Sequence, residues 1–398
     1  MKKIKRNILT AFIFPLIFTT LVSCGKKESH YVKVGLLHSL TGAMALSETP
    51  VRDAELLAID EINKNGGVLG KEIKVIQEDG KSTPAKFSEK AKKLLEQDKV
   101  ATVFGCWTSN SRKAVKPIFE EHYKLLWYPV QYEGMEASPN IMYMGASPNQ
   151  QVVPAVDWAR ENLGKKFFLI GSDYSFPRIA NRIIKTQAKN IDAEIAAEIY
   201  VPMDKSDFSA VIKEIKNTKP DVIINTINGN SNISFFQQLK QNGIKATDIP
   251  VISFSVSEGE INSIGIENLT NHYIAWNYFE STDTKENAEF VKKYKNTYGQ
   301  NKKVGDPVEA AYIAVHLWAK ACEKAGTFET EAVRIAAKGL TFQAPEGLIT
   351  LEGSNQHLYK TVRIGKISKN GNVDEIWATP SPIRPDPYLS TYAWARGL

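Results

Sequence analysis

The feature that most constrains the fold is an alternation of short apolar runs with amphipathic helical segments. In the first part of the chain the strand-like runs lie at 32–37, 73–77, 100–104 and 125–128. Between them, apolar residues recur at helical spacing. Short apolar runs of this kind are typical of strands buried on both faces of a parallel sheet. The alternation therefore predicts an α/β fold in which helices cover both faces of such a sheet.

The same pattern starts again near residue 152 and predicts a second unit, so we expect two doubly wound lobes with parallel-type central sheets. Three further helices and several short strands follow residue 278, which implies that the chain crosses between the lobes more than once. Multiple crossings make a hinge, and a cleft between lobes is a natural ligand site. We expect an N-terminal lobe from 31–148 plus 281–342, and a C-terminal lobe from 149–280 plus 343–398.

Residues 1–24 have the pattern of an export signal. Four basic residues precede an apolar stretch at 8–21, which is too short to span a bilayer and contains Pro15. Leu21-Val-Ser-Cys24 resembles the lipobox of bacterial lipoproteins, in which the cysteine is diacylated and becomes the new N-terminus. An uncleaved anchor and plain secretion are the alternatives. The prediction is an extracytoplasmic protein, in the periplasm or at the cell surface, held to a membrane through Cys24.

Composition argues against several functional classes. Removal of residues 1–23 lowers the formal net charge from +6 to +2, so no strongly basic surface remains to indicate nucleic-acid binding. The six histidines show no metal-ligand spacing, and we expect neither a metal nor a cofactor. No dinucleotide fingerprint, G-x-S-x-G elbow or H-E-x-x-H motif is present, which favours a binding protein over an enzyme.

Polar side chains gather where two neighbouring strands end. Gly105-Cys-Trp-Thr-Ser-Asn-Ser-Arg-Lys113 follows one apolar run, and Tyr128-Pro-Val-Gln-Tyr-Glu-Gly134 follows the next. The carboxyl edge of an open parallel sheet is where small molecules bind. A helix start there adds unpaired N–H donors and a positive dipole end. Ser109 either faces this edge or only caps the helix.

Seven short motifs, in this order and spacing, resemble the type I periplasmic binding proteins that serve ABC transporters. They are the two stretches above together with Gly35-Leu-Leu-His-Ser-Leu-Thr-Gly42, Gly171-Ser-Asp-Tyr-Ser-Phe-Pro177, Asn228-Gly-Asn-Ser-Asn232, Ala344-Pro-Glu-Gly347 and Pro382-Ile-Arg-Pro-Asp-Pro-Tyr388. The similarity is greatest to the branch that binds urea and short-chain amides. It implies a solute-binding lipoprotein that captures urea between its lobes and delivers it to the permease subunits of an ABC transporter.

The chemistry of urea indicates which residues to expect in the site. Urea has four N–H donors, one carbonyl acceptor and almost no apolar surface, so its pocket must be rich in acceptors. Ser109 or a helix-start N–H would meet the carbonyl, and Trp107 would cover the planar face. The expected ligand-binding residues are Trp107, Ser109, Tyr128, Gln131, Tyr174, Asn228 and Glu258.

Several of these residues have ordinary alternatives. Trp107 and Tyr128 follow apolar runs and fit a core position, and Asn228 fits a turn before a helix. Gly259 stands where the resemblance leads us to expect a bulkier residue, which weakens the role of Glu258. Arg112 and Lys113 are expected to be solvated helix charges.

Two other ligand classes remain open. One is a short-chain aliphatic amide, bound for transport or for sensing. The other is a branched-chain amino acid, whose carboxylate and ammonium groups need separate partners, with Glu258 as a candidate for the ammonium.

Overall fold

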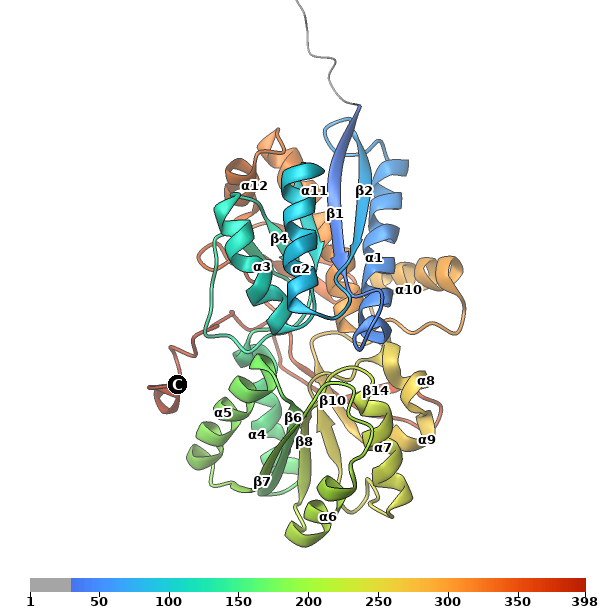
Figure 1. Cartoon of the computed structure of the whole chain (residues 1–398), viewed down its shortest axis with the longest axis vertical. Helices are drawn as coiled ribbons and strands as arrows, with labels where there is room; N and C mark the ends of the chain where they lie inside the picture. Colours follow the sequence, from blue (N-terminus) through green and yellow to red (C-terminus); the bar gives the residue numbers. More distant parts are fainter. Residues whose placement is uncertain (1–29) are drawn as a thin grey trace, which may run out of the picture.

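The computed structural model describes residues 30–398, so the predicted signal segment and Cys24 lie outside the described residues. Figure 1 shows two α/β lobes, one above the other, with the chain passing between them several times. The predicted fold class is confirmed.

The first lobe has a five-stranded parallel sheet in the order β2-β1-β3-β4-β5. Helices α1 and α11 pack against one another on one face, and α2 and α3 pack together elsewhere on the sheet. The strands are β1 (Tyr31–His38), β2 (Glu72–Asp79), β3 (Thr102–Gly105), β4 (Leu126–Tyr128) and β5 (Ile141–Tyr143). The helices are α1 (Ala45–Lys64), α2 (Pro84–Lys92), α3 (Ser109–Glu121), α10 (Lys285–Tyr298), α11 (Asp306–Ala325) and α12 (Thr330–Ala337).

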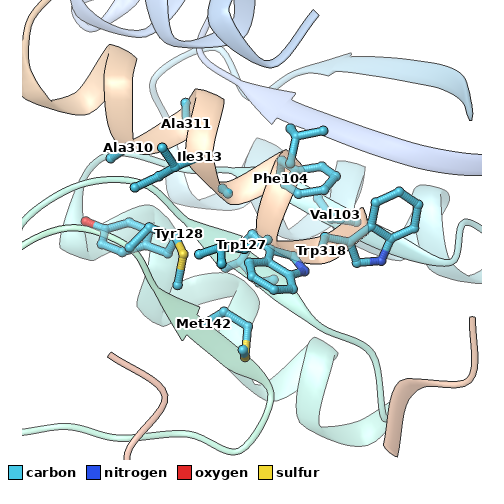
Figure 2. Packing of buried hydrophobic residues seen from close by; sticks show 14 of the residues in the cluster. Val103, Phe104, Trp127, Tyr128, Met142, Ala310, Ala311, Ile313 and Trp318 are labelled. Carbon is cyan, nitrogen blue, oxygen red and sulfur yellow. The ribbon is translucent and has the colours of Figure 1, made fainter. Parts of the chain in front are cut away.

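The core of this lobe joins segments that are far apart in the sequence. Figure 2 shows side chains of α11, among them Ala310, Ile313 and Trp318, together with residues of β3 and β4. The ring of Phe104 meets that of Trp318 edge-on at 5.9 Å between centroids, a favoured geometry for aromatic pairs. The core therefore holds α11 on the sheet whose carboxyl edge carries the predicted site.

The second lobe has a seven-stranded sheet in the order β14-β13-β10-β9-β8-β6-β7, in which β13 runs antiparallel to both of its neighbours, β10 and β14. One apolar cluster joins α4 and α5 to the sheet, and another joins α6 and α7 to it. The strands are β6 (Lys166–Ser172), β7 (Glu194–Val201), β8 (Val222–Thr226), β9 (Val251–Ser253), β10 (Tyr273–Trp276), β13 (Arg363–Ile367) and β14 (Val373–Ala378). The helices are α4 (Val152–Asn162), α5 (Ser175–Asn190), α6 (Ser209–Thr218), α7 (Ser231–Gln241), α8 (Ile261–Ile264) and α9 (Ile266–Leu269).

One lobe boundary differs from expectation. The expected return to the second lobe at residue 343 falls inside a hairpin formed by β11 (Thr341–Ala344) and β12 (Gly347–Thr350). Ile349 and Leu358 pack in the core of the first lobe, and the chain rejoins the second lobe at β13.

The three crossings between the lobes meet at one buried side chain. The Asn277 carboxamide donates to the carbonyl of Gln150 at 2.9 Å and to that of Thr361 at 3.0 Å. Gln150 lies on the crossing after β5, Asn277 on the crossing after β10, and Thr361 on the crossing before β13. The Asn277 N–H also donates to the carboxylate of Asp306, at 2.9 Å. One amide therefore ties the three segments of the hinge together.

Replacement of Asn277 by aspartate should destabilise the protein strongly. Aspartate has the same shape but no N–H groups, so two buried carbonyls lose their donor and a second negative charge faces Asp306. We expect a loss of about 2–6 kcal/mol in the free energy of unfolding, at about 1–3 kcal/mol for each of the two unpaired buried carbonyls. Denaturant unfolding of the variant measures it. Asn296→Asp, at an exposed position of α10, is the control for the added charge, and an equal loss in both variants would contradict the role of Asn277.

Candidate functional site

The loop after β3 approaches the end of β1 closely. Gly105 has φ +136°, and a Cβ there would lie 2.1 Å from the carbonyl oxygen of Leu37, so only glycine fits. Thr108 caps α3, because its side chain accepts from the N–H of Ser111 at 3.1 Å. Ser109 is the first residue of the helix and is buried. The alternative that Ser109 serves as the cap does not hold, because Thr108 takes that place.

The loop after β4 is joined to the loop after β3 through Tyr128. This side chain is completely buried, and its hydroxyl donates to the carbonyl of Trp107. Burial raises the pKa of the Tyr128 phenol, which keeps its proton and remains a donor. Tyr128 is thus a core residue, as one of the sequence interpretations had it, and it fixes the spacing of Trp107 and the following loop.

A buried ion cluster lies beneath these loops. Arg112 was expected to be solvated, but it is wholly buried, with Nη2 3.2 Å from Glu133 and Nε 2.9 Å from Glu136. Its guanidinium stacks on two aromatic rings, with the ring centroid of Tyr132 at 4.7 Å. Lys113 is partly exposed and reaches Glu133 at 3.1 Å. The expectation for Arg112 was wrong because a side chain three residues from Ser109 shares its helix face, and that face is covered by the loop after β4.

Ser109 is bonded to both members of the central ion pair. Its Oγ donates to Glu133, and Nη1 of Arg112 donates to it at 3.1 Å. Burial alone would raise the pKa of the Glu133 carboxyl, but the Arg112 guanidinium, the Ser109 hydroxyl and Lys113 outweigh it and lower that pKa below its usual range. Glu133 is therefore a carboxylate at neutral pH. The sequence analysis missed it, although it stands in the Tyr128–Gly134 stretch.

Side chains of these loops cross to the second lobe. Gln131 Nε2 donates to the carbonyl of Phe254 at 2.8 Å. Trp107 Nε1 donates to Asn228 Oδ1 at 3.4 Å. On the other side of Ser109, Asn110 accepts from the hydroxyl of Ser175 at 2.9 Å. The carboxyl edges of the two sheets therefore face one another, and Ser109 lies in a turn that contacts both lobes.

The second lobe contributes Tyr174 and Asn228. Asn228 follows β8, and its side-chain N–H donates to the carbonyl of Thr226 at 3.1 Å, which leaves its oxygen for Trp107. The Tyr174 side chain is also buried, and burial raises the pKa of its phenol. The structure thus brings together Trp107, Ser109, Tyr128, Gln131, Tyr174 and Asn228 around the interlobe contact.

One atom of this group is unusual. Gln131 Oε1 is buried and has no hydrogen-bond partner within the described residues. A buried acceptor without a donor costs about 1–3 kcal/mol. Because the Nε2 atom of the same amide is engaged by Phe254, the amide orientation is fixed and Oε1 is left without a donor.

Glu258 belongs to a different part of the molecule. Its Oε2 accepts from the N–H of Glu280, at 2.7 Å, on the crossing after β10. Burial raises the pKa of the Glu258 carboxyl well above its usual range. Within the described part of the chain, this residue lies at the hinge, accepts from the N–H of Glu280 and makes no hydrogen bond to the other six residues.

Other features bound the chemistry. In residues 30–398 no group of three or more His, Cys, Asp or Glu side chains is arranged to hold a metal ion. Cys106 and Cys322 are both buried free thiols. No helix in the same range is long and apolar enough to cross a bilayer.

A cavity of about 570 Å³ lies between α1, α8 and the loop after α10, and none of the seven predicted residues lines it.

Comparison with known proteins places the chain in a family. Residues 32–393 match the model of the periplasmic binding protein domain. The chain belongs to this family. It is a type I periplasmic binding protein of an ABC transporter, and the family implies an extracytoplasmic location.

Individual relatives are distant. A Leu/Ile/Val-binding protein homologue of Brucella melitensis is 22% identical over 378 residues, which cover 93% of this chain and 94% of the relative. A solute binding protein of an ABC transporter from Rhodopseudomonas palustris, solved with 3,4-dihydroxybenzoic acid, superposes with a TM-score of 0.82 at 24% identity, over 90% of this chain and 99% of that one. A branched-chain amino acid transporter substrate binding protein of Streptococcus pneumoniae, solved with isoleucine, has a TM-score of 0.78 at 21% identity, over 89% and 100%.

Replacement of Glu258 by glutamine should change stability but not ligand binding. The raised folded pKa means that the folded protein retains a proton which the unfolded chain releases near 4.5. The corresponding stabilisation is present at low pH and is lost as the pH rises through the folded pKa. Glutamine keeps the bond from Glu280 without titrating.

The stability of the variant, measured relative to that of the wild type, should therefore increase as the pH is raised from about 5 to about 8. Denaturant unfolding at both pH values measures this difference. If the stabilities of the variant and the wild type change with pH in the same way, Glu258 has another role. A clear fall in the ligand affinity of the variant would show the same.

Proposed function

We propose that this periplasmic binding protein captures urea in the cleft between its lobes and presents it unchanged to the permease subunits of its ABC transporter. It would then resemble the urea transporter substrate-binding protein in function as well as in its motifs. The observation that carries the proposal is the free Gln131 Oε1, a buried acceptor with a fixed orientation beside the interlobe contact. A ligand rich in N–H groups satisfies it.

The remaining groups fit the other atoms of urea. Ser109 Oγ and Asn228 Oδ1 are acceptors, and the first N–H groups of α3 are donors for a carbonyl. Trp107 and Tyr174 are aromatic and nearly buried, which suits a flat molecule from which water is excluded. Acetamide has two N–H groups fewer than urea and a methyl group that favours apolar contact, so the concentration of acceptors favours urea.

The size of urea sets the affinity that the site can reach. Four heavy atoms at about 1.5 kcal/mol each give a binding free energy of roughly 6 kcal/mol. This corresponds to a dissociation constant between millimolar and micromolar. Tighter binding requires closure of the lobes around every polar atom of the ligand.

A branched-chain amino acid is the second candidate, and the name of the Brucella relative favours it. Such a ligand carries a carboxylate, an ammonium group and a large apolar side chain. Glu258, the residue considered for the ammonium, is bonded to Glu280 at the hinge. We therefore rank this ligand below urea.

The proposal also includes the predicted anchor. Acylation of Cys24 would leave a mature chain from that residue onward, held at a membrane surface next to its permease. Labelling of the expressed precursor with a radioactive fatty acid tests this, with Cys24→Ser as the control that should lose the label.

The ligand assignment predicts the order of response in calorimetry on residues 25–398. Urea should give the largest response, followed by acetamide and formamide, with leucine weakest. A bound ligand should also raise the melting temperature through mass action. A clear preference for leucine would overturn the assignment, and sustained release of ammonia from urea would overturn the binding-only function.

Two substitutions test the contacts. Ser109→Ala and Gln131→Ala should each weaken urea binding about 5- to 100-fold, because each leaves a buried N–H of the ligand without an acceptor, at about 1–3 kcal/mol. Melting curves show whether the variants fold. Asn296→Ala on the exposed face of α10 should leave the affinity unchanged, and unaltered affinity in both site variants would remove these residues from the site.

A further inference from the structure

We propose that Glu133 fixes the orientation of the Ser109 hydroxyl, so that the cleft accepts the N–H groups of neutral amides and rejects carboxylates. This inference rests on the proposed function, in that it requires a ligand between the lobes at Ser109. It assigns to Glu133 the role of a positioning residue that sets ligand class.

The direction of each hydrogen bond at Ser109 follows from its partners. A serine hydroxyl has one donor and two acceptor positions. Glu133 as a carboxylate only accepts, so it takes the hydroxyl proton of Ser109. Arg112 only donates, and it occupies one lone pair from 3.1 Å. Ser109 Oγ therefore retains a single lone pair and no proton for a ligand.

The hydrogen bonds among Ser109, Arg112 and Glu133 cannot exchange easily for others. Ser109, Arg112 and Glu133 are all buried, so water does not compete for their bonds. The nitrogens of Arg112 are occupied by Ser109, Glu133 and Glu136. The guanidinium of Arg112 is therefore engaged with protein partners, although it lies next to Ser109.

The remaining lone pair belongs to a turn that faces the second lobe. Trp107 and Asn110, on either side of Ser109, contact Asn228 and Ser175. A ligand held between these contacts meets an acceptor at Ser109 and a second acceptor at Gln131 Oε1. The N–H groups of an amide suit both atoms.

A carboxylate meets the opposite situation. It brings only acceptors, so it would face two protein acceptors, Ser109 Oγ and Gln131 Oε1, with no proton on either side of these contacts. Acceptors that are buried without a donor cost free energy. The free N–H groups at the start of α3 would suit the oxygen of an amide and of a carboxylate alike, so the discrimination depends on Ser109 and Glu133.

Acetamide and acetate are the probes that test this, because they have nearly the same shape and differ in charge and in N–H groups. Their dissociation constants, with that of urea, are to be measured for the wild type, Glu133→Gln and Glu136→Gln. Glu136→Gln is the matched control, since Glu136 binds the same arginine, at 2.9 Å, without touching Ser109. Melting curves report folding of each variant.

In Glu133→Gln the new amide can donate to Ser109 and turn the hydroxyl proton toward the ligand. We expect the preference for acetamide over acetate to fall at least about 10-fold, by about 1.4 kcal/mol or more. Glu136→Gln should change it by less than about 3-fold. An equal change in both variants, or an unchanged preference in Glu133→Gln, would overturn the inference.

Two further measurements keep the test decisive. If Glu133→Gln does not fold, Glu133→Asp retains the charge but is too short to hold Ser109, and the same fall in preference is expected. In the background of Ser109→Ala, replacement of Glu133 should have no further effect on the preference, because the hydroxyl through which it acts is absent. A full additional effect would show that Glu133 acts by charge alone and would overturn the inference.

The outcome separates this inference from the proposed function. A wild type that binds acetamide or formamide better than urea removes urea as the ligand and leaves the role of Glu133 standing. A wild type that binds acetate or leucine as tightly as any amide overturns the role of Glu133, whichever amide it prefers.

Discussion

The structure depends on one hydrogen-bonded junction, the carboxamide of Asn277. Both of its N–H groups are used, one on each of the other two crossing segments. Because an amide is planar, these bonds fix the three segments relative to one another at a single point. The backbone on either side is fixed as well, since the N–H of Asn277 donates to Asp306 and its carbonyl accepts from Arg363 at 2.9 Å. The three crossings are therefore tied together at one buried point, which is the arrangement of a hinge between the lobes.

The contacts in the cleft are of another kind. At the hinge a buried amide bonds to backbone carbonyls, whereas in the cleft side chains of loops meet across the lobes. Trp107 and Asn228, or Asn110 and Ser175, are pairs in which either partner can bond to water or to a ligand when the lobes separate. The fold thus combines a fixed junction with a set of exchangeable contacts, which is what a protein that opens and closes around a solute requires.

Much of this architecture could be predicted from the sequence. Apolar runs and helical spacing are local signals, and they predicted the two parallel-type sheets and the loops at their carboxyl edges. Six of the seven predicted site residues lie together because each follows a strand, and parallel strands end at the same edge. The signal for Trp107 and Gln131 was their place after a strand, which needs no knowledge of the partner lobe.

The errors share a cause, which is that burial by a distant segment leaves no local signal. Arg112 stands beside Lys113 near a helix start and has the pattern of a solvated charge, but the loop after β4 covers it and supplies Glu133. Glu258 follows a strand like the other six predicted residues, yet its partner is a backbone N–H on a crossing 22 residues further along the chain. The β11–β12 hairpin carries an alternating pattern that fits either lobe, and only its packing on the first-lobe core assigns it.

The free Gln131 Oε1 indicates how a small ligand with an N–H group would favour closure of the lobes. Direct bonds between the lobes, such as Ser47 to Glu260 at 2.6 Å and Gln131 to Phe254 at 2.8 Å, each contribute about 0.5–1.5 kcal/mol to closure. A buried Oε1 without a donor opposes closure by about 1–3 kcal/mol. An N–H group placed on Oε1 removes this opposing contribution. A ligand shifts such an equilibrium only through its differential affinity for the two states, and Gln131 Oε1 is one acceptor in the proposed site that contributes to this difference.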